Sequence, residues 1–375
     1  MHTGPGRAAE PLGTRNSEPG TLEPLGTRDS ELGTLVVQTA YLGDVVLTLP
    51  LIQRLAARFG PVDVLTTPAA TPLLTGQPSV RRVIPYDKRG ADRGGAGLLR
   101  LAGRLRAERY ARAFLPHRSL RSALVARLAG IPERTGFAGG FAGLWHTARV
   151  ERPARGHETS RLASLAGPAT AVTAPWLTLT EENRRNADAW LEARGVGQEF
   201  IVLAPGARWA TKRWPYFAGL ASALPLPVVV IGGPDDREAG AAVMRAAPGR
   251  AHSAAGDLTL PQSAAVIDRA ALVVSNDSVA LHLAAALARP VVAVAGPTGP
   301  APGFEPFSPD DPVVAHPDLS CRPCSLHGHD RCPLGHHRCM VELGVERVSA
   351  MVLARLAGIA ETPTRKAERG TESVQ

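Results

Sequence analysis

The sequence predicts an α/β protein built from two Rossmann-like domains whose parallel sheets face each other across a cleft. Two series of short, continuously apolar segments alternate with segments of helical spacing. Such alternation implies parallel strands joined by right-handed crossovers. An irregular stretch at residues 166–183, which holds two prolines, separates the two series. The 375 residues are enough to bury two cores of ordinary size.

The first series predicts strands at residues 35–38, 62–67, 80–86 and 110–116. A helix is expected directly after Asp44, because apolar side chains recur there at helical spacing. These side chains are Val45, Leu49, Ile52, Leu55 and Phe59. Together these elements define a first domain over residues 35–170.

The second series predicts strands at residues 200–206, 227–233, 271–275 and 290–297, within a second domain over residues 171–345. Both ends of the chain differ in composition from the domains. Residues 1–34 repeat EPLGTRNS as EPLGTRDS, and this Gly-, Pro- and Thr-rich tract and the tail at 361–375 are expected to be disordered. A translation start assigned too far upstream would explain the first tract equally well.

The charge pattern argues against nucleic-acid binding. The formal net charge is +8, but only three lysines occur, and the arginines are scattered among acids along the whole chain. Attraction to an anionic membrane surface or a phosphorylated acceptor fits this composition better. The apolar runs are too short to span a bilayer and the N-terminus lacks a signal-peptide core, so a cytoplasmic protein is expected.

The first candidate site is the segment at residues 39–50. Gly43 follows a buried strand and permits close approach of the backbone, and Asp44 occupies the place of a helix N-cap or of a carboxylate facing the cleft. A capping carboxylate would stay ionised but would be a weaker base. It could still deprotonate a sugar hydroxyl whose acidity rises in the transition state.

The second candidate is the loop at residues 204–215. Pro205 and Gly206 end a strand, and a basic run formed by Arg208, Lys212 and Arg213 follows. Cations at the carboxyl end of a strand suit a diphosphate leaving group, whose charge must be neutralised as the bond breaks. A solvated basic loop is the alternative.

The third candidate is the junction at residues 273–287, where a buried strand runs directly into a helix. Such a junction presents free backbone N–H groups to phosphates. Asp277 and Ser278 form the turn, and His282 lies four residues after Ser278, on the same helical face. The alternative is that the turn residues only cap the helix and that His282 packs in the core.

Two further clusters complete the set. His117, Arg118, Arg121 and Arg134 give the first domain a basic rim that could hold an anionic acceptor or could cover a solvated face. One segment carries all four cysteines, Cys321, Cys324, Cys332 and Cys339, with four histidines between them. A CxxC pair followed by two more cysteines predicts either a structural zinc site or a loop of reduced thiols.

Six segments occur in a fixed order: GDVVLTLP at 43–50, SALVARLAGIPERTGF at 122–137, PGARWATKRWP at 205–215, GGPDDRE at 232–238, SNDSVALHLAAALARPVVAVAGPT at 275–298 and CPLGHHRCM at 332–340. Together they resemble the lipopolysaccharide heptosyltransferases of glycosyltransferase family 9. The resemblance covers about Leu35 to Gly358 and is nearer the second heptosyltransferase than the first.

The resemblance implies a GT-B fold, with the acceptor on the first domain, the nucleotide sugar on the second, and a last helix at 346–360 that returns to the first domain. The implied reaction transfers L-glycero-D-manno-heptose from ADP-heptose to the inner core of lipopolysaccharide, with inversion. No cofactor and no covalent intermediate are needed, because a single displacement with one base suffices. A peripheral contact with the anionic inner membrane is expected.

By the same resemblance, Asp44 matches the catalytic base and Lys212 matches the lysine that contacts the donor phosphates. Asp277, Ser278 and His282 match the donor turn and helix, and Gly43 and Gly206 belong to the acceptor and donor loops. The chain has Val279 where the family often has glycine. Glu238 matches an acid near the donor ribose, with Asp236 as the competing residue. A transferase of another nucleotide sugar and a non-catalytic nucleotide-binding module are the alternative functions.

Overall fold

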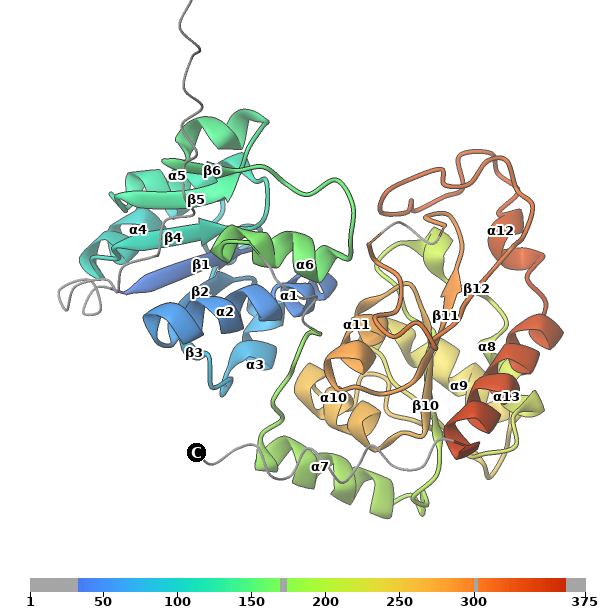
Figure 1. Cartoon of the computed structure of the whole chain (residues 1–375). Helices are drawn as coiled ribbons and strands as arrows, with labels where there is room; N and C mark the ends of the chain where they lie inside the picture. Colours follow the sequence, from blue (N-terminus) through green and yellow to red (C-terminus); the bar gives the residue numbers. More distant parts are fainter. Residues whose placement is uncertain (1–32, 169–173, 300–302, 362–375) are drawn as a thin grey trace, which may run out of the picture.

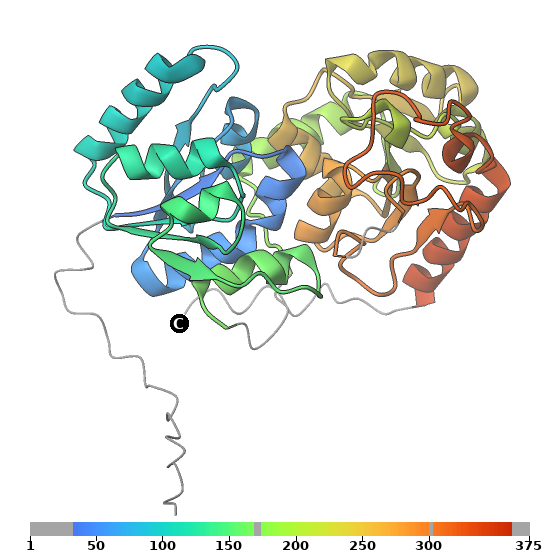
Figure 2. The ribbon, with the colours of Figure 1, turned by 90° about the horizontal axis from the view of Figure 1, so that it is seen from above.

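The computed structural model describes residues 33–168, 174–299 and 303–361. These residues form two α/β domains that lie side by side (Figures 1 and 2). The disorder expected for residues 1–34 and 361–375 falls almost entirely outside the described residues. Thr34 already belongs to the first strand, and Glu361 still belongs to the last helix.

The first domain holds a six-stranded sheet of order β3-β2-β1-β4-β5-β6, in which every neighbouring pair is parallel. The strands are β1 Thr34–Gln38, β2 Val62–Thr66, β3 Val80–Pro85, β4 Arg112–Leu115, β5 Glu133–Phe137 and β6 Ala148–Val150. The helices are α1 Leu42–Leu47, α2 Leu49–Phe59, α3 Thr71–Leu74, α4 Gly94–Ala107, α5 Leu120–Leu128 and α6 Glu158–Ala163, with short 3₁₀ helices η1 Pro68–Ala70, η2 Phe141–Trp145 and η3 Ser164–Ala166.

The second domain repeats this topology, with the strand order β12-β11-β10-β7-β8-β9 and all pairs parallel. The strands are β7 Ile201–Ala204, β8 Val228–Val230, β9 Ala251–Ser253, β10 Leu272–Asn276, β11 Val291–Ala295 and β12 Val313–Ala315. The helices are α7 Glu181–Glu192, α8 Phe217–Ala223, α9 Arg237–Ala246, α10 Leu260–Arg269, α11 Val279–Ala286, α12 Arg338–Val341 and α13 Val345–Glu361, with 3₁₀ helices η4 Ala210–Lys212 and η5 Pro234–Asp236.

Both sheets are buried on two faces, which explains why their central strands are continuously apolar. In β1, Val36 packs with α2 on one face, whereas Leu35 and Val37 pack with α4 and α5 on the other. In β7, Val202 and Ile201 divide between the two faces in the same way. The α/β prediction and all eight predicted strands are confirmed.

Four strands were not predicted: β5, β6, β9 and β12. β6, β9 and β12 have only three residues each and lie at sheet edges. β5 has the sequence ERTGF, whose polar residues hide its strand character. None of them carries the continuous apolar run that marks a central parallel strand.

The topology fixes where each domain binds its ligand. In the first sheet, β2 and β3 are added on one side of β1, whereas β4, β5 and β6 are added on the other side, so the strand order reverses between β1 and β4. In the second sheet it reverses in the same way between β7 and β10. Loops that follow the strands at such switch points open a crevice at the carboxyl end of the sheet. Asp44 and His117 follow β1 and β4, and Lys212 and Asp277 follow β7 and β10.

The two domains contact each other chiefly through α1 and α11, and α3 also packs on α10. A second contact joins the segment before α6 to the loop after β11, where the N–H of Glu158 donates to the carbonyl of Gly303 at 2.8 Å. The connection between the domains is held by Gln77, whose amide exchanges two hydrogen bonds with the backbone of Thr178.

The last helix, α13, packs against α8, β11 and β12 of the second domain. Val348 and Val352 are fully buried in the second core, and Arg355 forms an ion pair with Asp311 at 3.0 Å. This corrects the expectation that residues 346–360 return to the first domain. Among the helices that the structure describes, none has the length and hydropathy required to cross a membrane.

Candidate active site

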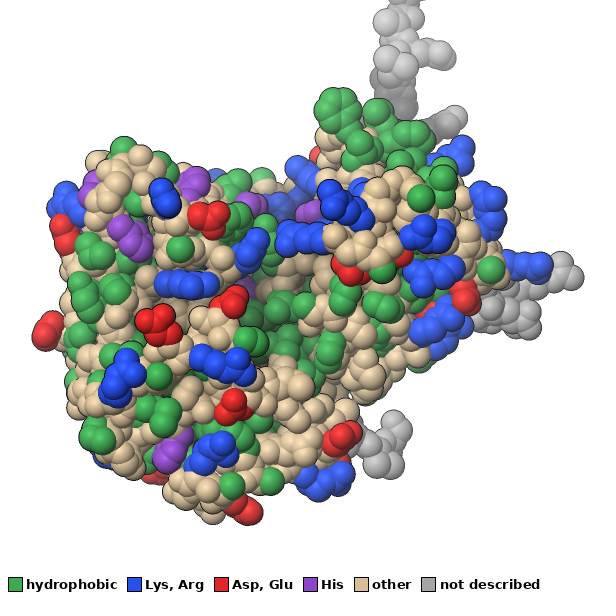
Figure 3. All heavy atoms as spheres, turned by 180° about the vertical axis from the view of Figure 1, so that it is seen from behind, with side chains coloured by type: hydrophobic (Ala, Val, Ile, Leu, Met, Phe, Trp, Pro, Cys, Tyr) green, Lys and Arg blue, Asp and Glu red, His purple; other side chains and the backbone are tan. Residues whose placement is uncertain are grey.

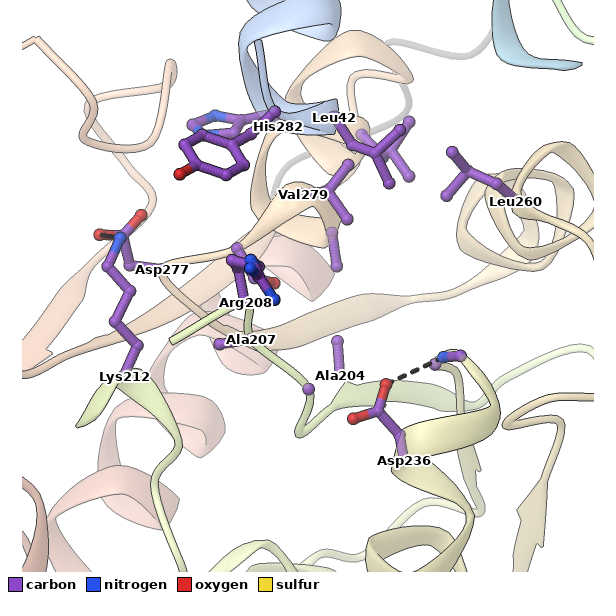
Figure 4. A pocket seen from close by; sticks show the side chains of 18 of the residues that line it. Leu42, Ala204, Ala207, Arg208, Lys212, Asp236, Leu260, Asp277, Val279 and His282 are labelled. Carbon is purple, nitrogen blue, oxygen red and sulfur yellow. Dashed lines mark hydrogen bonds and ion pairs between the residues drawn. The ribbon is translucent and has the colours of Figure 1, made fainter. Parts of the chain in front are cut away.

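A cavity of about 650 Å³ lies where the two domains meet. The first domain contributes the start of α1 and a residue of η1, namely Tyr41, Leu42, Gly43, Asp44, Leu47 and Ala69. The second domain contributes the loops after β7, β8 and β10 and the tip of the cysteine segment, including Gly206, Arg208, Lys212, Asp236, Asp277, Ser278, Val279, His282, Leu326 and His327. Figure 4 shows part of this lining.

Asp44 is the third residue of α1, and its carboxylate accepts a hydrogen bond from the N–H of Tyr41 at 3.1 Å. Burial raises the pKa of Asp44 above its usual value, and this effect outweighs the opposing Tyr41 hydrogen bond and the nearby His117. The sequence suggested a cap that weakens the base. The structure corrects that view, because desolvation dominates and makes the carboxylate a stronger base.

Gly43 lies directly against the ring of His282 in the other domain. A Cβ atom at residue 43 would come within 2.9 Å of Cδ2 of His282, which is closer than van der Waals contact permits. A side chain at residue 43 would therefore force the imidazole of His282 or the start of α1 to move. This contact lies where the Asp44 loop of the first domain meets α11 of the second.

His282 is buried, with 6% of its surface exposed, and desolvation lowers its pKa to about 4. Its imidazole is therefore neutral at physiological pH and can sit near the Lys212 ammonium without repulsion. His282 is at once the core histidine and the cavity-lining residue that the sequence presented as alternatives.

Lys212 and Asp277 form the central ion pair of the second half of the site. Their side chains are 13% and 18% exposed, and the Nζ–Oδ2 distance is 2.7 Å (Figure 4). Thr298 donates a second hydrogen bond to the same carboxylate at 2.9 Å. Asn276 ties the two loops together, since it donates to the carbonyl of Pro205 and accepts from the N–H of Trp214.

The turn before α11 is not a simple capping turn. Ser278 occupies the N-cap position but makes no side-chain capping bond, and its hydroxyl instead contacts that of Ser275 at 3.1 Å. The Asp277 side chain is directed to Lys212 and Thr298. Val279, the first helical residue, lines the cavity, so the N-terminus of α11 faces the open space.

Asp236 lies over the ends of β7 and β8. Its carboxylate accepts from the N–H of Gly233 at 2.9 Å, and a Cβ atom at Gly206 would come within 2.5 Å of it. Gly206 therefore must lack a side chain for Asp236 to reach the cavity. Asp236 lines the cavity, whereas Glu238 is exposed on α9 and is not among the lining residues, so the geometry favours the competing residue.

The structure places the residues of the predicted basic rim in different surroundings. His117 lies near Asp44, and desolvation lowers its pKa while the Asp44 charge opposes this. Arg121 instead donates to Tyr86 and to the carbonyls of Asp92 and Gly94.

Arg134 likewise donates to the carbonyls of Ile131, Pro132 and Trp145. Arg118 is exposed and contacts the carbonyl of Ala138 at 3.4 Å. Only His117 of the predicted rim is close to Asp44. Arg121 and Arg134 each donate several hydrogen bonds within the first domain, and their contact with an acceptor stays a prediction.

The cysteine segment brings residues to the cleft that the sequence did not single out. Leu326 and His327 line the cavity, and the His327 ring lies 6.4 Å from that of Tyr41. The segment is fastened to η4 by Thr211, whose hydroxyl donates to the carbonyl of His329 at 2.8 Å. In the sequence, the cluster of histidines between the cysteines was the feature that could have indicated a place at the cleft.

Comparison with known proteins agrees with this arrangement. The sequence model of glycosyltransferase family 9 (heptosyltransferase) matches residues 98–332. Lipopolysaccharide heptosyltransferase 2 of Escherichia coli K12 is 32% identical over 295 residues, which are 71% of this chain and 83% of that protein. The enzyme of the same name from Salmonella typhimurium is 32% identical over 298 residues, with the same coverage.

This chain belongs to glycosyltransferase family 9. Its structure superposes on that of the E. coli ADP-heptose lipopolysaccharide heptosyltransferase II with a TM-score of 0.71 at 27% identity, covering 87% of this chain and 99% of the other. A family 9 glycosyltransferase from Veillonella parvula has the same fold, with a TM-score of 0.76 at 22% identity, covering 87% and 98%. The predicted family and GT-B architecture are confirmed.

The four cysteines of this glycosyltransferase are reduced in the structure. Among the residues described, no three His, Cys, Asp or Glu side chains form a group that could hold a metal ion. Burial raises the pKa of Cys339 to about 11 and also raises that of Cys324, so both thiols are protonated at neutral pH. The zinc alternative for Cys321, Cys324, Cys332 and Cys339 is therefore not confirmed by the residues that the structure describes.

We expect Lys212→Ala to weaken ADP binding by about 10- to 100-fold, because a charge-assisted contact to a phosphate contributes roughly 1.5–3 kcal/mol. Turnover should also fall, since leaving-group charge would be left unneutralised. Isothermal titration with ADP and steady-state kinetics measure both effects. Arg245→Ala, which removes an exposed positive charge from α9 of the same domain, is the control. Normal ADP affinity and normal turnover in Lys212→Ala would refute the role.

Proposed function

We propose that this glycosyltransferase transfers L-glycero-D-manno-heptose from ADP-heptose to the inner core of lipopolysaccharide, with inversion at the anomeric carbon. The observation that carries the proposal is that the Asp44 carboxylate of one domain and the Lys212–Asp277 pair of the other line a single cavity. The relatives named lipopolysaccharide heptosyltransferase 2 support the choice of sugar and acceptor.

The geometry suits a single displacement. Asp44 accepts the proton of an acceptor hydroxyl, and that oxygen forms a bond to the anomeric carbon from the face opposite ADP. The bond between the anomeric carbon and the diphosphate oxygen breaks, and its electron pair leaves with ADP. Because base and leaving group lie on opposite sides of the sugar, inversion follows directly.

The second domain is suited to receive the charge that ADP gains. Lys212 and Arg208 line the donor side of the cavity, and the N-terminus of α11 presents N–H groups to the same space. Asp277 holds the Lys212 ammonium in place before the donor arrives, so little reorganisation is required during the reaction. Asp236 is placed to accept hydrogen bonds from a ribose at the ends of β7 and β8.

The first domain supplies the acceptor side. The raised pKa of Asp44 strengthens it as a base, while neighbouring His117 and His327 favour its ionised form. Acceptor phosphates or carboxylates would meet His117 beside the base and Arg118 at the rim. Catalysis in this proposal needs no metal ion or cofactor, because a carboxylate and a cationic loop supply the two roles that the displacement requires.

The proposed partners are ADP-heptose and a lipid-anchored acceptor, and we infer that the protein works in peripheral contact with the inner face of the inner membrane. A lipid-borne acceptor requires the cleft to lie near a bilayer surface. The four cysteines have no catalytic part in this proposal.

The direct test is incubation of the purified full-length protein with ADP-heptose and either a Kdo-terminated or a monoheptosylated acceptor. We expect release of ADP and addition of one heptose to the monoheptosylated acceptor, detected by mass spectrometry. The rate should be the same with and without EDTA. If a folded, ADP-binding protein releases no ADP with either acceptor, the proposed function is wrong.

Asp44→Asn should reduce turnover by about 10²–10⁴-fold, because the general base is lost while the shape of the side chain is kept. ADP affinity should stay within about twofold of wild type, since Asp44 belongs to the acceptor domain. Turnover and calorimetric ADP binding measure the two quantities, with Asp318→Asn, an exposed residue of the second domain, as control. A comparable loss of ADP binding in Asp44→Asn would contradict the assignment.

A further inference from the structure

The 3₁₀ helix η2 presents three large apolar side chains to solvent. Phe141, Leu144 and Trp145 are 79%, 70% and 37% exposed, although they lie within five consecutive residues. Single exposed apolar residues are common on proteins, but a contiguous group of this kind marks an interaction surface. We call these three residues the η2 patch.

The η2 patch is rigidly held. Ala142 and Gly143, which lie between the exposed residues, are buried, and η2 packs against α5. Gly139 and Gly140 both have positive φ angles, of 82° and 65°, and turn the chain sharply into η2. The apolar side chains are therefore displayed outward by a fixed scaffold.

The charge around the η2 patch is strongly positive. Of the six arginines in residues 111–150, Arg118, Arg127 and Arg149 are exposed, whereas Arg112 is buried and pairs with Glu133 at 3.3 Å. The guanidinium of Arg134 donates to the carbonyl of Trp145 at 2.8 Å. Arg127 lies close enough to Arg134 for the two charges to interact, and Arg149 lies close enough to His146, the residue that follows the patch, to act on it in the same way.

The patch is continuous with the acceptor side of the cleft. Arg118 follows His117, the rim residue near Asp44, and its guanidinium contacts the carbonyl of Ala138, three residues before η2. Figure 3 shows hydrophobic side chains gathered at one end of the first domain, with Lys and Arg side chains between them and the hollow that separates the domains.

We propose that the η2 patch and its surrounding arginines dock this protein on a bilayer that contains anionic phospholipid. Aromatic and aliphatic side chains would enter the interface, and the arginines would contact lipid phosphates. The inference deepens the proposed function and rests on it for the lipid-borne acceptor, because docking here brings the bilayer next to the acceptor side of the cleft.

The test measures sedimentation of the full-length protein with vesicles of phosphatidylcholine alone or with 30 mol% phosphatidylglycerol, at about 0.1 M salt. Wild type should bind the anionic vesicles, and the triple variant Phe141→Ser/Leu144→Ser/Trp145→Ser should bind them about tenfold more weakly. A matched variant, Met244→Ser/Leu334→Ser/Leu353→Ser, removes three exposed apolar side chains of the second domain and should bind as wild type does.

Two further measurements separate the contribution of the arginines from that of the apolar side chains, and a loss of docking from a loss of catalysis. Arg127→Gln/Arg149→Gln should weaken binding to anionic vesicles and leave the weak binding to neutral vesicles unchanged. With a water-soluble, deacylated acceptor, the triple variant should keep wild-type kcat/KM, so failure of the docking proposal and failure of the transferase proposal give different results. Equal vesicle binding by wild type and triple variant, or a dimer in light scattering that the triple variant dissociates, would overturn the docking proposal.

Discussion

The active site depends on one contact between the domains, that of Gly43 on α1 with the ring of His282 on α11. Each domain contributes the loops at its own switch point to one shared cavity. The two halves face each other because α1 and α11 pack closely, and they can do so because residue 43 has no side chain. Burial between the domains lowers the pKa of His282 and keeps its imidazole neutral.

The two domains supply groups of opposite charge to the cavity. The first domain buries the Asp44 carboxylate at the cavity, which raises its pKa and strengthens it as a base. The second domain holds a paired ammonium, whose charge is positioned by Asp277 and Thr298 before any donor binds. Proton uptake requires a carboxylate and charge neutralisation requires a cation, and separate loops supply these two groups. The docking surface at η2 lies next to the acceptor side of the cleft and brings it close to the lipid.

The sequence predicted the central strands and the residues that follow them, because buried parallel strands are continuously apolar and their carboxyl ends carry the site. Asp44, Lys212, Asp277 and His282 were found in this way. The position of His327 at the cleft was not predicted, because it depends on tertiary contacts of the cysteine segment such as its hydrogen bonds with Thr211. The sequence also cannot show that Arg121 and Arg134 donate hydrogen bonds to backbone carbonyls of the first domain.

The most direct test of the interdomain contact is the effect of Gly43→Ala on kcat/KM, measured both in wild type and in a His282→Ala background. The added Cβ should lower kcat/KM by about tenfold or more when the imidazole is present, and by less than about twofold when it has been removed. The absolute activity of His282→Ala does not affect this comparison, since only the ratio within each background counts. Equal losses in the two backgrounds would contradict the claim that this contact sets the geometry of the site.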